Sequence, residues 1–152
     1  MMVNNAAHRI HFLEVRSEQT LLALMRASDV VLDPFPVGNA VLSLQALSVG
    51  APVVTLPGEF LKSRLTLAML ERLQVLDLVA KSEADYARIA LSVAHSEARR
   101  ELLSSAIVRN AGHLFEDFRA VREWERFLKT IAKETKKVHG DDDAQREEEE
   151  TF

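Results

Sequence analysis

The residues that could best bind a ligand lie in a loop and at the start of a helix, between Leu32 and Gly58. This stretch reads LDPFPVGNAVLSLQALSVGAPVVTLPG and contains three of the chain's five glycines. A helix that begins just after a strand's carboxyl end presents unpaired backbone N–H groups, and the peptide dipoles add partial positive charge there. Such an end suits a phosphate group, and a glycine at the turn lets the backbone approach the phosphate closely.

Gly38 and Asn39, followed by the apolar residues Ala40, Val41 and Leu42, fit this description. We therefore interpret the backbone amides of Gly38, Asn39, Val41 and Leu42 as a candidate diphosphate cradle. A Gly-Asn pair at a strand-to-helix junction also commonly serves the turn alone, because both residues tolerate tight backbone conformations. The residues by themselves leave both interpretations open.

Composition bounds the class of protein. The chain has 152 residues, 47% of them apolar and 28% charged, which indicates one globular domain with its own core. A net charge of −4 disfavours a general nucleic-acid binder, and the absence of cysteine excludes disulfides and thiolate metal sites. The five histidines lack metal-ligand spacing, so no metal is predicted. With no secretory signal and no apolar run of about 20 residues, we expect a cytoplasmic or nuclear protein without membrane contact.

The elements that must position this loop alternate in type. Short apolar or β-branched runs predict strands over 9–15, 29–33 and 51–57, and helical spacing predicts helices over 17–27, 39–49 and 59–73. Gly50 stands where a left-handed residue ends a helix. Strands and helices in this alternation are typical of a parallel α/β sheet with right-handed crossovers.

The second half is predicted to be helical after a short extended segment over 75–82. The sequence SEAD, from Ser82 to Asp85, is a capping box that starts one helix, and two more packing helices follow around 102–107 and from about Asp117. Residues 137–152 are too acidic and too poor in apolar side chains to offset their ordering entropy. We therefore expect a folded domain over 9–136 between a disordered N-terminus (1–8) and a disordered acidic tail (137–152).

Three segments carry a resemblance to a known family: RIHF, the run ASDVVLDPFPVGNAVLSLQALSVGAPVVTLPGEFLKSRLTLAMLERL, and VLDLVAKSEADYARIAL. From about Arg9 to Leu128 the chain resembles the C-terminal catalytic region of the O-linked N-acetylglucosamine transferases and their SPINDLY-like relatives. The resemblance implies a GT-B glycosyltransferase whose second Rossmann-like domain binds UDP-N-acetylglucosamine. Such enzymes pass the sugar to Ser or Thr hydroxyls of acceptor proteins and need no metal or other cofactor.

The sequence departs from the family pattern at the candidate site. Family members have hydroxyl-bearing residues where this chain has Ala40, Val41 and Leu42, and an acid for the ribose where it has Gln45. The Gln45 amide can still bond a ribose diol, but without the charge that strengthens such bonds. A Lys and a His of the animal enzymes correspond to Glu18 and Leu21. The resemblance therefore implies a retained scaffold with a weakened nucleotide site.

Length is the other departure. A GT-B enzyme needs two Rossmann-like domains, whereas this chain matches only a partial one, a parallel sheet followed by packing helices. We expect it not to catalyse alone and to self-associate or pair with a missing half-domain. The alternatives are a degenerate, non-catalytic domain that acts by protein association, or a fragment of a longer gene product. The donor sugar is also open, because SPINDLY-like relatives use fucose on the same scaffold.

Overall fold

The computed structural model describes the backbone of residues 7–149 and the side chains of residues 8–135. The chain divides into two compact units, Met1–Phe115 and Glu116–Phe152, which are considered separately below. Of the N-terminus predicted to be disordered, residues 1–6 lie outside the described residues, and Ala7–Arg9 form a short 3₁₀ turn, η1.

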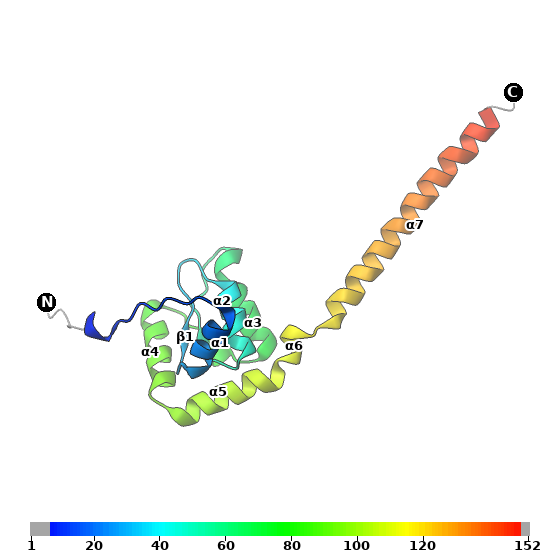
Figure 1. The fold of residues 1–152 in the computed structure, drawn as a ribbon. Coiled ribbons are helices and arrows are strands. Elements are labelled where there is room, and N and C mark those ends of the chain that lie inside the picture. Colours follow the sequence, from blue (N-terminus) through cyan, green and yellow to red (C-terminus); the bar gives the residue numbers. More distant parts are fainter. Residues whose placement is uncertain (1–6, 150–152) are drawn as a thin grey trace. The chain divides into compact units, whose positions relative to one another are not determined.

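The first unit alternates helices with short strands and then becomes helical (Figure 1). Its elements after η1 are α1 (Glu18–Ala27), β1 (Val31–Leu32), α2 (Ala40–Ser48), β2 (Val53–Val54), η2 (Leu61–Ser63), α3 (Leu65–Leu73), η3 (Leu76–Leu78), α4 (Glu83–Ala94), α5 (Glu97–Asn110) and α6 (Gly112–Phe115). The order strand, helix, strand, helix in its first part confirms the predicted α/β class.

The sheet is small and parallel. β1 pairs with β2 in the register Val31 to Val53 and Leu32 to Val54, and α2 forms the connection between them. A further parallel bridge joins Thr55 to Val79 on the far side of β2. The segment 75–82 is predicted to be extended, but Leu76–Leu78 form the 3₁₀ turn η3, and Val79 is the residue of this segment that pairs with the sheet. Parallel strands require crossover connections, which explains why helices separate these short strands.

Two other predicted elements, a strand and the start of a helix, differ from those in the structure. Residues 9–15 were predicted as a strand, but no strand forms there, and Ile10, Phe12 and Leu13 are exposed. A strand needs a neighbour for its backbone hydrogen bonds, and β-branched or aromatic composition alone does not supply one. The helix predicted from residue 59 begins as the 3₁₀ turn η2, and α3 follows only from Leu65.

The core lies where α2, β2, α3, η3, α4 and α5 meet. Its largest fully buried apolar side chains are Leu47, Val53, Val54, Leu70, Leu73, Leu78, Val93 and Ile107. Burial of one such side chain contributes roughly 1.5–3 kcal/mol. One polar contact lies among them, because the buried Thr66 hydroxyl of α3 donates to the Ser43 hydroxyl of α2 over 3.0 Å.

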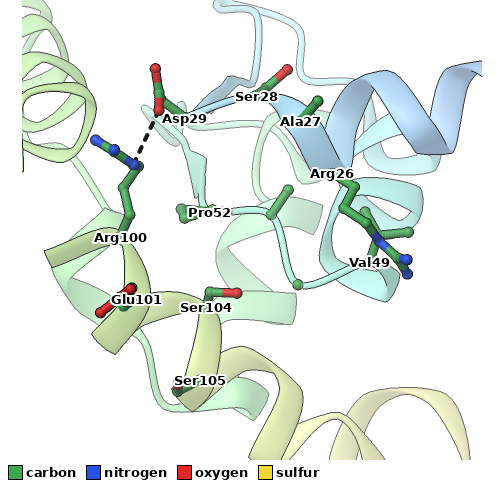
Figure 2. Close-up of a pocket in the computed structure, with 12 residues that line it drawn as sticks. Arg26, Ala27, Ser28, Asp29, Val49, Pro52, Arg100, Glu101, Ser104 and Ser105 are labelled. Carbon is green, nitrogen blue, oxygen red and sulfur yellow. Dashed lines mark ion pairs between the residues drawn. The ribbon is translucent and has the colours of Figure 1, made fainter. Parts of the chain in front are cut away.

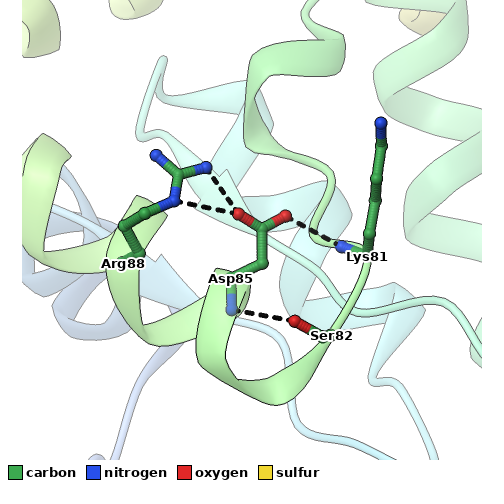
Figure 3. Close-up of polar contacts among 4 residues, drawn as sticks. All are labelled: Lys81, Ser82, Asp85 and Arg88. Atoms are coloured by element: carbon green, nitrogen blue, oxygen red, sulfur yellow. Dashed lines mark hydrogen bonds and ion pairs between the residues drawn. The ribbon is translucent and has the colours of Figure 1, made fainter.

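Local sequence signals account for the helix starts. Ser17, Ser82 and Ser96 cap α1, α4 and α5, and each side-chain oxygen accepts from the amide three residues later. The capping box predicted at Ser82 forms with one variation, since the Asp85 carboxylate accepts from the Lys81 amide rather than from that of Ser82 (Figure 3).

Asp85 also pairs with Arg88 one turn later in α4 (Figure 3). The hydrogen bond from the Lys81 amide, followed by the bonds and charge of the Arg88 guanidinium, lowers the pKa of the Asp85 carboxyl below its ordinary 3.8. The charged carboxylate is therefore part of the α4 cap.

The predicted left-handed end of α2 is confirmed. Gly50 has φ of 78° and follows the C-cap residue Val49. It also lies close to α5, because a Cβ atom placed on Gly50 would be 2.9 Å from Val108 Cγ2 and 3.1 Å from Ser104 Oγ. Both the backbone conformation and this close approach require glycine.

The second unit consists of α7 (Phe118–Glu149), which begins after Asp117 accepts from the Arg119 amide. Helical backbone continues through 137–149, where the sequence analysis expects disorder, and residues 150–152 lie outside the described residues. Glu, Lys, Arg, Gln and Ala are good helix formers, so local propensity favours helix in a segment that has little to bury. Among the described residues, no helix is long and apolar enough to cross a membrane.

Candidate functional site

Three loops meet at the edge of the sheet where the parallel strands end. They follow β1 (33–39), β2 (56–64) and the paired residue Val79 (80–82). The Phe35 ring of the first loop packs edge-on against the Tyr86 ring of α4, with ring centroids 5.1 Å apart. A Cβ on Gly58 would lie 3.9 Å from the Pro36 carbonyl oxygen, so the first two loops also touch. Ligands of open α/β sheets bind at this carboxyl edge.

The structure places the predicted cradle, Gly38 to Leu42, at this edge, as the first turn of α2 and the residues before it. Asn39 caps the helix, because its side-chain oxygen accepts from the Leu42 amide over 3.2 Å. The Asn39 amide in turn donates to Asp33 Oδ1 over 2.8 Å.

Because of these contacts, fewer backbone amides can donate to a phosphate than the sequence predicts. The amides of Asn39 and Leu42 already have acceptors within the chain, which spacing alone did not reveal. The amides of Ala40 and Val41 lie in the first turn of α2 and have no acceptor inside the helix. Together with Gly38 they are the donors that remain for a ligand. Whether a phosphate binds them stays a prediction.

Gln45, predicted for the ribose, lies one turn further into α2. Its side-chain amide donates to Glu18 Oε1 at the start of α1 over 3.2 Å. The structure thus brings together two positions at which the sequence departs from the family pattern. Sequence reasoning named both positions but not their contact, because 27 residues separate them.

One buried carboxylate shapes the electrostatics of the edge. Asp33 directly follows β1 and is only 3% exposed. The Tyr86 hydroxyl donates to the Asp33 carbonyl oxygen over 2.9 Å. Burial, and to a smaller extent the negative charge of Asp33, raise the pKa of Tyr86 above its ordinary value of 10.0, so this hydroxyl stays a donor at neutral pH. No motif or spacing in the sequence predicts a role for Asp33 at this edge.

Cationic side chains flank the same edge. Arg64 donates from Nη1 to the Gly58 carbonyl oxygen over 3.0 Å, which ties it to the loop after β2. Lys62 and Lys81 are exposed in the loops after β2 and Val79. In the described part of the chain, no group of three or more His, Cys, Asp or Glu side chains is arranged to hold a metal ion.

A pocket of about 560 Å³ lies at the opposite edge, where the strands begin (Figure 2). Asp29 and Pro52, which precede β1 and β2, line it together with Arg100 of α5. Arg100 Nε pairs with Asp29 Oδ1 at 3.1 Å, and its Nη1 donates to the carbonyl oxygens of Val93 and Ala94 at the end of α4. Because these groups already bind one another, Arg100 links α5 to the end of α4 and to Asp29. The pocket therefore does not indicate a particular class of ligand.

A parallel α/β sheet with a helix N-terminus at its carboxyl edge places the chain in the class of Rossmann-like α/β folds. Comparison of the sequence with known families narrows this class. Residues 2–121 match glycosyl transferase family 41, and the chain belongs to this family.

A solved structure with a closely similar fold is a mutant O-GlcNAc transferase of Thermobaculum terrenum. It is 27% identical to this chain, and the two superpose with a TM-score of 0.73. The match covers 82% of this chain and 24% of that protein, so the chain spans about a quarter of the relative's length. The likeness agrees with the GT-B C-terminal region predicted from the sequence.

Proposed function

We propose that this chain supplies the donor-binding part of a protein O-N-acetylglucosaminyltransferase-like enzyme, with a UDP-sugar as its ligand. The observation that carries the proposal is the N-terminus of α2, which lies at the carboxyl edge of the parallel sheet in a member of glycosyl transferase family 41. The amides of Gly38, Ala40 and Val41 would bind the diphosphate, and Gln45 would bond the ribose.

In this proposal, catalysis requires further domains besides this chain. Upstream domains would complete the cleft, and the sugar would pass to Ser or Thr hydroxyls of acceptor proteins in the cytoplasm or nucleus. By itself the chain would bind the donor weakly, because Ala40 and Val41 contribute no hydroxyl donors and two of the nearby amides bond within the chain. Each missing hydrogen bond to a charged phosphate is worth about 1.5–3 kcal/mol.

The test is a titration of the ¹⁵N-labelled full chain with UDP, followed by NMR. Binding at the proposed site should shift the amide signals of Gly38, Ala40 and Val41, and leave those of Gly50 and Ala51 at the opposite edge unchanged. Uridine, which lacks the phosphates, should shift these signals much less.

A matched pair of variants separates charge at the site from a general effect on the protein. Val41→Asp places an anion at the cradle on a side chain that is 67% exposed, and should abolish the UDP shifts without unfolding the chain. Leu102→Asp makes the same change on α5, at a side chain that is 69% exposed, and should bind UDP like the wild type. Equal UDP response in both variants, or none in the wild type, would overturn the proposal.

A second function has its own supporting observation. Val37, Phe60 and Leu61 belong to the same carboxyl-edge loops and are exposed, as is Val41 at the start of α2. Apolar side chains gathered at an exposed edge are typical of protein interaction sites. A non-catalytic domain that acts through protein association is therefore the alternative, and it is favoured if UDP produces no shift at this edge.

A further inference from the structure

We propose that Asp33 is a positioning residue that holds the start of α2 in the geometry required for diphosphate binding. The inference rests on the proposed function for its ligand, but the contacts that carry it do not depend on that ligand. Asp33 lies at the end of β1, and its backbone amide donates to the Val54 carbonyl oxygen of β2 over 2.9 Å. Its backbone is thus part of the sheet, and its side chain reaches toward the loop.

Both carboxylate oxygens of Asp33 have partners. Oδ1 accepts from the Asn39 amide over 2.8 Å, and Oδ2 accepts from the Thr55 hydroxyl over 2.8 Å. Thr55 is 1% exposed and follows β2, while Asn39 caps α2. A single buried carboxylate therefore links the ends of both strands to the N-cap residue of α2.

The loop is closed tightly around this carboxylate. A Cβ on Gly38 would lie 3.0 Å from Asp33 Oδ2 and 3.2 Å from Oδ1, which is closer than ordinary van der Waals contact, so a larger residue would require the carboxylate to shift. This close approach favours glycine at position 38. It also means that the sequence signal attributed to a phosphate arises in part from an internal anion.

The arrangement decides which donors face a ligand. With the Asn39 amide bonded to Asp33 and the Leu42 amide bonded to the Asn39 side chain, the helix start is held rigidly and the amides of Ala40 and Val41 are left for an external anion. A preorganised set of donors binds an anion without the cost of ordering a loop. Loss of the Asp33 contacts should therefore weaken phosphate binding without affecting the groups that would bind the nucleoside.

The first experiment measures hydrogen exchange of the Asn39 amide by NMR in the ligand-free full chain. In Asp33→Ala the protection of this amide should fall by about tenfold or more, since a hydrogen bond to a charged acceptor is lost. Asp33→Asn keeps an oxygen acceptor in place and should restore most of the protection. If Asp33→Ala does not fold, Thr55→Val decides, because it frees only one carboxylate oxygen and should give an intermediate loss. Asn39 protection that is unchanged in both Asp33→Ala and Thr55→Val would overturn the proposal.

The second experiment compares the affinities of UDP and uridine for the same variants. Asp33→Ala should weaken UDP binding by about tenfold and leave uridine binding unchanged, whereas Asp33→Asn should bind UDP at least as well as the wild type, because a like charge near the phosphates is removed. A merely structural role would weaken both ligands together and would contradict the inference. If the wild type binds no UDP while Asn39 protection still depends on Asp33, the proposed function fails and the positioning of the loop stands.

Discussion

At the scale of single residues, the contact between Gln45 and Glu18 alters what restoring the family's acid would achieve. The Gln45 side-chain amide now donates to Glu18 Oε1 over 3.2 Å, and Gln45→Asp would replace it with a shorter side chain whose carboxylate stands near Glu18, so the two like charges would repel. We predict that Gln45→Asp alone leaves UDP affinity unchanged or lower. The double change Gln45→Asp with Glu18→Lys should raise the affinity about three- to tenfold, because the new acid gains a cationic neighbour and a charged bond to the ribose.

Calorimetric titration of the wild type, both single variants and the double variant measures this coupling. Glu18→Lys alone is the control, since it adds the cation without the acid. A full gain from Gln45→Asp alone would show that the contact with Glu18 does not constrain the site.

Asp85 leads to a prediction about pH. Its folded pKa lies below 3.8, so the stabilisation from its charged form is fully present above that value and is lost as the pH falls through the folded pKa. Asp85→Asn should therefore melt at a lower temperature than the wild type at pH 7, and the difference should shrink as the pH falls through the folded pKa of Asp85, below 3.8. Thermal melts across this range measure it. Glu83→Gln, in the same first turn of α4, is the control, and an equal effect of both variants would assign the change to general helix charge.

At the scale of elements, the passage from α2 into β2 depends on Gly50. A side chain there would meet a left-handed backbone and the Val108 side chain of α5 at 2.9 Å. We predict that Gly50→Ala lowers the free energy of unfolding by about 2 kcal/mol or more, from backbone strain and overpacking together. Urea unfolding measures this. Gly112→Ala is the control, because a Cβ at Gly112 meets nothing within 4 Å, and this variant should be neutral or slightly stabilising.

At the scale of the whole molecule, exposed apolar side chains and short strands with open edges predict self-association. Phe60 and Leu61, 70% and 77% exposed, stand beside the candidate site. We expect sedimentation that depends on concentration, and an association weakened about tenfold by changing both residues to Ser, since apolar area is lost. Leu91→Ser, on α4 at 58% exposure, is the control. A monomer at all concentrations would contradict the prediction.

The acidic end of the chain should contribute nothing to the stability of the first unit. The buried apolar core extends from Met25 to Ile107, and residues 140–152 contain few apolar side chains. Removal of 140–152 should leave the melting temperature within about 2 °C of the wild type, while the helical signal in circular dichroism falls. A larger drop in the melting temperature would show that this segment packs on the folded chain.

The family, the α/β class and the residues that begin and end helices can be predicted from the sequence. Ser17, Ser82 and Gly50 act through backbone groups within a few residues of themselves, so their roles can be predicted from spacing. The candidate loop was also located correctly at the start of α2, because a glycine, an asparagine and an apolar helix follow one another directly.

Which backbone amides of that loop already have an acceptor within the chain follows from long-range contacts and cannot be predicted from the sequence. The carboxylate of Asp33 binds Asn39 and, across the sheet, Thr55, which is 22 residues away, and no sequence spacing encodes such a contact. The absence of a strand over 9–15 has the same origin, because pairing depends on a neighbour and not on composition. Hydrogen bonds between distant segments exist only after the core has packed, and in this protein they assign the Asn39 amide to Asp33, whereas the amides of Ala40 and Val41 have no acceptor inside the helix.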